Sequence, residues 1–156
     1  MAGLKSELIT WSPTFSVGVK LIDDQHRGLL DLVNHLFNHV VGDEEAERDF
    51  FQEVIQEAVK YVRVHFATEE KIMIATKFPG YPEHKKAHDT FVLTVVNNIK
   101  DFEDGKKFSL AAITKFLKEW ILTHIAIVDK EYFNYFKNIA SRKADGRLGI
   151  SSENIS

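Results

Sequence analysis

The most constraining feature of this sequence is the stretch from His65 to His88, HFATEEKIMIATKFPGYPEHKKAH. It contains His65-x-x-x-Glu69, then a break with two prolines and a glycine, then His84-x-x-x-His88. Residues four apart lie above one another on the same face of a helix. Each half therefore presents two potential metal ligands from one face. Two such pairs on consecutive helices can meet in the shared interior of a helical bundle.

Length and composition exclude several classes of protein. The 156 residues suit one domain with a substantial core, and the net charge of −3 argues against a nucleic-acid-binding surface. There is no cysteine, which excludes disulfides, Fe–S clusters, thiolate zinc sites and cysteine nucleophiles. The sequence shows neither a signal peptide nor an apolar run long enough to cross a bilayer. We therefore expect a cytoplasmic protein without membrane insertion.

Hydrophobic residues recur at helical spacing in four segments, separated by short breaks. The predicted helices cover about 23–41, 45–77, 83–103 and 109–138. Asp23 or Asp24 would cap the first of them and Ser109 the last.

Four helices with short connections predict an all-α fold, an antiparallel up-down-up-down four-helix bundle. We expect a single domain over 1–156. It would consist of an irregular N-terminal arm (1–20), the bundle (about 21–138) and a short polar C-terminal tail (about 139–156).

Each predicted helix places at least one histidine on its apolar face. The five are His26, His65, His84, His88 and His124. One such histidine alone is typical of a hydrogen-bonded core residue. Five buried imidazoles together with an inward-facing Glu69 are difficult to satisfy without a metal ion. Imidazole and carboxylate ligands suit several transition metals, so the ligand types alone do not identify the ion.

Asp129 follows His124 by five residues, in the segment HIAIVD. Five residues correspond to about 140° around an ideal α-helix. The two side chains can therefore reach one site only from either side of the helix, or through a π-helical turn between them. A regular helix with Asp129 pointing to solvent would exclude Asp129 from the site.

Several segments resemble the hemerythrin family, in particular its single-domain bacterial members, the bacteriohemerythrins. The matching pieces are Trp11 with SVGV, IDDQH ending at His26, HFATEE, YPEHKKAH and WILTHIAIVD. Together they cover roughly residues 10–136, and every ligand position of the family is present.

The resemblance implies a non-heme di-iron site, with two iron ions per chain bridged by an oxo or hydroxo group. His84, His88 and His124 would bind one iron, and His26 and His65 the other. Glu69 and Asp129 would bridge both. The iron with two histidines would keep an open position for dioxygen. We expect the pocket around that position to be apolar and lined by Leu30, Ile72, Met73 and Trp120, which also pack in the core.

The expected function is reversible dioxygen binding, for carriage, storage or delivery to a partner oxygenase or oxidase, rather than enzymatic activity. The alternative is a di-iron enzyme, for example a peroxidase, or a sensor acting on peroxide, nitric oxide or dioxygen. Oxygen-activating bundles typically use a carboxylate-rich set with two Glu-x-x-His motifs. Five histidines with two carboxylates differ from that set and favour binding.

Overall fold

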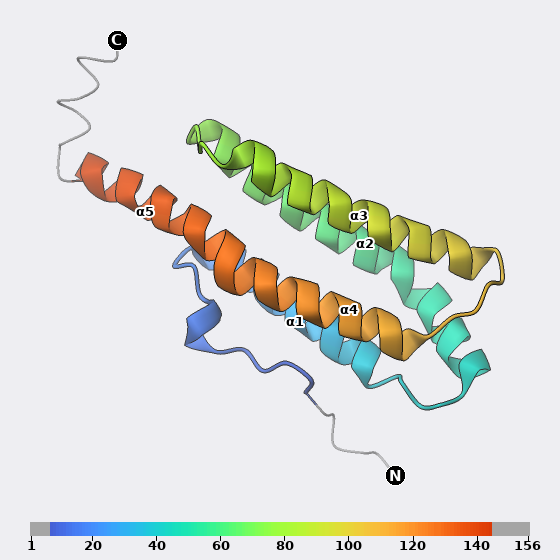
Figure 1. Cartoon of the computed structure of the whole chain (residues 1–156). Coiled ribbons are helices and arrows are strands. Elements are labelled where there is room, and N and C mark those ends of the chain that lie inside the picture. Colours follow the sequence, from blue (N-terminus) through green and yellow to red (C-terminus); the bar gives the residue numbers. More distant parts are fainter. Residues whose placement is uncertain (1–6, 145–156) are drawn as a thin grey trace.

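Four helical rods lie side by side in the computed structural model, which describes residues 7–144 (Figure 1). The first three are α1 (Lys20–Phe37), α2 (Glu44–Ala75) and α3 (Tyr81–Glu103). The fourth rod is continuous and consists of α4 (Leu110–Thr123), a π-helical turn (His124–Asp129) and α5 (Lys130–Ala144). Consecutive rods run in opposite directions and are joined at alternate ends. The predicted all-α, up-down-up-down bundle is confirmed.

The first helix differs from its prediction at both ends. It begins at Lys20, and its N-cap is Val19, so neither Asp23 nor Asp24 caps it. The carboxylate of Asp23 instead accepts hydrogen bonds from the Ser16 hydroxyl at 2.5 Å and from the Val17 backbone N–H at 2.8 Å. Asp23 thus fixes the arm to the bundle. The helix ends at Phe37, because the N–H groups of His39 and Val40 bond three residues back in tighter turns.

The other helix ends lie closer to the prediction, with one exception. Ser109 caps α4 as predicted, its hydroxyl oxygen accepting the Ala112 N–H at 3.1 Å. The fourth rod, however, continues to Ala144. The predicted tail from about 139 is therefore wrong for residues 139–144, and its remainder lies outside the described residues.

The N-terminal arm is irregular over residues 7–19 except for a 3-10 turn at Pro13–Phe15. Asn34 on α1 holds the start of this segment. Its side-chain oxygen accepts the N–H groups of Leu8 at 2.7 Å and Ile9 at 2.9 Å, and its amide nitrogen donates to the Ile9 carbonyl at 2.7 Å. The part of the predicted arm before residue 7 lies outside the described residues.

The apolar core is divided into two clusters. The larger contains residues such as Leu29, and the smaller consists of Val17, Ile22, Met73, Tyr132 and Phe133. On α1 the buried His26 lies between Ile22 of the small cluster and Leu29 of the large one. The polar interior therefore forms a layer between two apolar regions. No helix within residues 7–144 is long and apolar enough to span a membrane.

Glu47 holds the loop between α1 and α2 by hydrogen bonds. Its carboxylate is almost fully buried and accepts the backbone N–H groups of Val41 and Gly42, both at 2.8 Å. We expect Glu47→Ala to lower the free energy of unfolding by about 2 kcal/mol, because two backbone N–H groups lose a charged acceptor. Urea denaturation measures this. Glu45→Ala, at an exposed position of the same turn, should change stability by no more than about 0.5 kcal/mol. Equal losses in both variants would contradict this role.

Candidate metal centre

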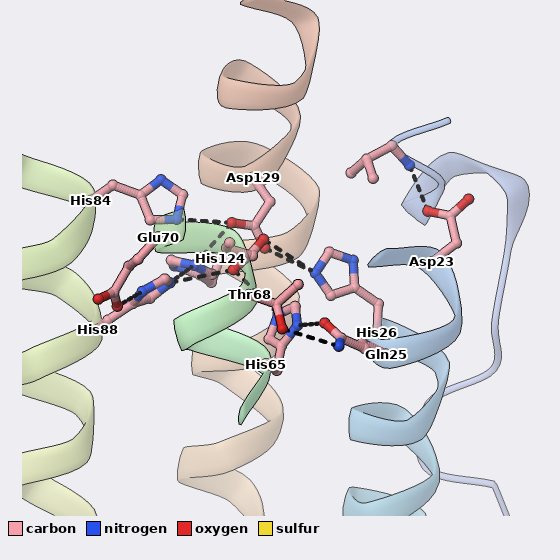
Figure 2. A network of polar contacts seen from close by, with 12 residues as sticks. Asp23, Gln25, His26, His65, Thr68, Glu70, His84, His88, His124 and Asp129 are labelled. Atoms are coloured by element: carbon pink, nitrogen blue, oxygen red, sulfur yellow. Dashed lines mark hydrogen bonds and ion pairs between the residues drawn. The ribbon is translucent and has the colours of Figure 1, made fainter. Parts of the chain in front are cut away.

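The structure brings all seven predicted ligand residues into one buried layer. Figure 2 shows the five histidines and Asp129 of this layer close together. Each of the four rods contributes, so residues far apart in the chain meet. Within the described residues the potential ligand atoms form two groups, in each of which all atoms lie within 4.8 Å of one another. One group is Glu69, His84, His88, His124 and Asp129, and the other is His26, His65, Glu69 and Asp129. The two carboxylates belong to both groups.

Asp129 lies between the two groups of histidines. Its Oδ1 atom is 3.0 Å from Nε2 of His84 and 3.0 Å from Nε2 of His124. Its Oδ2 atom is 3.1 Å from Nε2 of His26. One oxygen thus faces each group, which is the arrangement that a bridging carboxylate requires.

Glu69 also reaches both groups. Its Oε1 atom lies 3.2 Å from Nε2 of His65 and 3.4 Å from Nε2 of His88, and its Oε2 atom lies 3.7 Å from Nε2 of His26. Two ligands at right angles, each about 2.1 Å from an ion, are about 3.0 Å apart. Most of these distances, and the 2.9 Å between Nε2 of His88 and Nε2 of His124, approach that spacing.

Many polar atoms of this layer have no hydrogen-bond partner in the protein. In the described part of the chain, the buried side-chain atoms without one are both ring nitrogens of His26, Nε2 of His65 and of His84, and both oxygens of Glu69 and of Asp129. Unpaired buried polar groups are rare in native proteins because each costs free energy. Their concentration here, in a set of nitrogen and oxygen donors, fits the binding of metal ions.

The π-helical turn explains how His124 and Asp129 share one site. In this turn each N–H bonds five residues back, so positions five apart lie about one turn apart on the same side. Asp129 is fully buried and close to His124. The π-helical turn that the five-residue spacing allowed is confirmed, and a regular helix with Asp129 in solvent is excluded.

Two residues that the sequence did not single out orient the histidine rings. Oε2 of Glu70 accepts from Nδ1 of His88 at 2.8 Å, and Oε1 of Gln25 accepts from Nδ1 of His65 at 2.7 Å (Figure 2). Since both acceptors lack a proton to give, each Nδ1 carries the hydrogen. In a neutral ring, Nε2 then presents its lone pair to the centre.

The electrostatics of this layer favour cation binding. Burial lowers the pKa of His65 to about 4 and also lowers the pKa values of His88 and His124, so these rings are neutral near pH 7. Burial and the nearby charge of Asp129 raise the pKa of Glu69 well above its usual value. The carboxyl group of Glu69 therefore holds its proton more tightly than an ordinary glutamate does, and a bound cation would favour release of that proton.

His26 and Asp129 are in different electrostatic environments. Burial alone would lower the pKa of His26, but its contacts with Asp129 and Glu69 outweigh burial and raise it. Burial alone would raise the pKa of Asp129, but its close contacts with His124, His26 and His84 hold it well below its usual value. Asp129 is therefore the anionic carboxylate of the layer.

Aromatic rings enclose the three-histidine group. Phe66, which sequence reasoning missed, stacks on His88 with ring centroids 3.8 Å apart and planes at 4°. Trp120 stacks on His124 at 4.4 Å and 12°. Phe66 directly follows a candidate ligand in HFATEE, so only its contact with α3 reveals its role.

The four predicted pocket residues are divided between the two apolar clusters. Leu30 and Trp120 pack in the large cluster, and Ile72 and Met73 in the small one. Two of them, Leu30 and Met73, are buried. The residues therefore lie on both sides of the polar layer. His35 and His39 lie outside this layer, where both rings pack against Phe50.

Comparison with known proteins gives matches over the part of the chain that contains the seven ligand residues. Residues 17–136 match the model of the family described as the Hemerythrin HHE cation binding domain. A bacteriohemerythrin of Stenotrophomonas maltophilia is 32% identical over 130 residues, which cover 83% of this chain and 82% of that protein. Hemerythrin subunit 1 of Golfingia vulgaris is 30% identical over 122 residues, which cover 78% and 88%.

Solved structures show the same fold. A crystal structure of wild-type hemerythrin superposes with a TM-score of 0.71 at 29% identity, covering 81% of this chain and 96% of that one. A crystal structure of a hemerythrin point mutant gives a TM-score of 0.72, also at 29% identity, covering 83% and 97%.

Proposed function

Because the chain belongs to the hemerythrin family, which binds dioxygen at a di-iron site, we propose that this protein binds dioxygen reversibly at two iron ions. His84, His88 and His124 would hold one ion, and His26 and His65 the other. Glu69 and Asp129 would bridge them, together with an oxo or hydroxo group. The observation that carries the proposal is that the two carboxylates belong to both groups of ligand atoms.

The unequal numbers of histidines make the two proposed metal positions different. The group with His26 and His65 has one imidazole fewer than the group with His84, His88 and His124. An ion there would have a coordination position that no protein atom fills. When bound, the two ferrous ions would supply the electrons for dioxygen binding and recover them on release.

The apolar residues around this position would exclude water and proton donors from it. Ile22, Leu30 and Ile125 are buried at positions within four residues of the ligands on their helices. Such apolar packing limits the entry of water and acids, which favours release of intact dioxygen over its reduction. Delivery of the dioxygen to a partner oxygenase or oxidase is a further part of this proposal.

The test is a cycle of reduction, oxygenation and deoxygenation followed by visible absorption, together with iron analysis. The expected result is two irons per chain and an absorption band that appears with dioxygen and vanishes when it is removed. Iron that oxidises once and stays ferric, with turnover of added peroxide or nitric oxide, would overturn the proposal in favour of a di-iron enzyme.

A further inference from the structure

The two halves of the candidate centre differ in the residue that accepts the Nδ1 hydrogen bond of a histidine. On the three-histidine side, Nδ1 of His88 donates to the carboxylate of Glu70 at 2.8 Å. On the two-histidine side, Nδ1 of His65 donates to the uncharged amide oxygen of Gln25 at 2.7 Å. The geometry of the two hydrogen bonds is alike, but the charge of the acceptor is not.

The charge of the group that accepts the Nδ1 hydrogen bond affects how strongly Nε2 of the same histidine donates electrons to a bound metal ion. A carboxylate accepts a stronger hydrogen bond than an amide does and draws the ring proton toward itself. The imidazole then becomes a more basic ligand and donates more electron density through Nε2. A more basic ligand stabilises a ferric ion more than a ferrous one, because the ferric ion carries the larger charge.

The surroundings of Glu70 leave its negative charge largely uncompensated. A charged neighbour of Glu70 is Lys85, whose Nζ lies 3.7 Å from Oε1. That ammonium group is closer to Asp89, with both carboxylate oxygens at 3.0 Å. Lys85 is also 41% exposed, so water screens its charge. The side chain of Glu70 is only 19% exposed.

The surrounding side chains fix both hydrogen bonds. Phe66 stacks flat on the His88 ring, which keeps Nδ1 directed at Glu70. The amide nitrogen of Gln25 lies 3.4 Å from the Thr68 hydroxyl, and the Tyr61 hydroxyl donates to the Gln25 backbone carbonyl at 2.8 Å. The difference between the two sides is thus built into the packing of α1, α2 and α3.

We propose that Glu70 is a positioning residue that makes the two metal positions unequal, its carboxylate favouring the ferric state on the three-histidine side while Gln25 leaves the other side uncharged. This inference rests on the proposed di-iron function. It assigns to Glu70 an effect on oxidation state in addition to the orientation of His88.

The test compares the iron-loaded proteins of Glu70→Gln, Gln25→Glu and the control Glu57→Gln. Glu70→Gln keeps an acceptor for His88 but removes the charge, and Gln25→Glu adds a charge on the opposite side. Glu57 is an exposed residue of the same helix, about 20 Å from Glu70 along its axis. The readouts are iron content and the midpoint potential of the iron pair.

We expect Glu70→Gln to keep two irons and to lose about tenfold in ferric relative to ferrous affinity. That loss corresponds to a rise of about 59 mV in the potential of a one-electron couple. Gln25→Glu should lower the potential by a similar amount, and Glu57→Gln should leave it unchanged.

Equal potentials in Glu70→Gln, Glu57→Gln and the parent protein would overturn the inference while leaving the di-iron function intact. If Glu70→Gln does not retain iron, the potential of Gln25→Glu decides, and an unchanged value overturns the inference. A parent protein without two irons would instead refute the proposed function.

Discussion

The iron-loaded protein is expected to unfold at a temperature about 10 °C above that of the metal-free protein. The candidate ligands come from all four rods, so bound ions would connect every helix of the bundle. They would also satisfy the buried nitrogen and oxygen atoms that have no partner in the protein. A ligand present at about 1,000 times its dissociation constant stabilises the folded state by about 4 kcal/mol. For a chain of this size, each kcal/mol corresponds to about 2–4 °C.

Differential scanning calorimetry of loaded protein and of protein stripped by a chelator measures this shift. Residues of the apolar clusters are unaffected by the chelator, so the bundle should stay helical by circular dichroism. The same unfolding temperature with and without iron would show that the polar layer is stable by itself, and would contradict its assignment as a metal centre.

Replacing Asp129 by alanine should reduce the iron content from two ions to fewer than one per chain. Asp129 belongs to both ligand groups, with one oxygen facing each, so its loss leaves both positions short of a ligand. Loss of a residue behind a ligand already costs about 10–100-fold in metal affinity, and loss of a shared ligand should cost at least about 100-fold. Iron analysis after gel filtration measures the content.

The matched control is Glu131→Ala, which removes an exposed carboxylate two residues further along the same rod. It should retain two irons. Asp129→Asn separates size from charge, since the amide keeps the shape but is a weaker ligand, and it should bind iron less tightly than the parent. Two irons in Asp129→Ala would refute the bridging role.

Much of the fold was predictable because helix formation is encoded locally. Apolar residues at helical spacing and short breaks placed the four rods, and Ser109 marked the start of the last one. The start of α1 was not predictable in the same way. Asp23 is of a residue type that often caps helices. Its carboxylate instead accepts hydrogen bonds from the Ser16 hydroxyl and the Val17 backbone N–H, and these contacts depend on how the N-terminal arm folds against the bundle.

The candidate site was predictable to the same extent. The five histidines and Glu69 were identified from ligand type and position on the inner helix faces, and Asp129 from the family resemblance. The structure gathers all seven in one layer. The five-residue spacing of His124 and Asp129 indicated that they either reach the site from both sides of the helix or have a π-helical turn between them, and the structure shows the π-helical turn. The hydrogen-bond acceptors of the ligand histidines, Gln25 and Glu70, were missed. In the sequence they are polar residues next to a ligand, and nothing there indicates which histidine they contact.

Helical periodicity in the sequence therefore identifies which side chains face the interior, since it assigns each residue to a face whatever its neighbours are. Which of these residues contact one another follows from tertiary packing. His65 meets Gln25 from a different helix, and His88 meets Glu70 and Phe66 of α2. The predicted pocket residues likewise fall into two clusters on either side of the polar layer. Such contacts depend on the rotation and axial offset of one rod against another, which packing of the whole core sets and no single segment encodes.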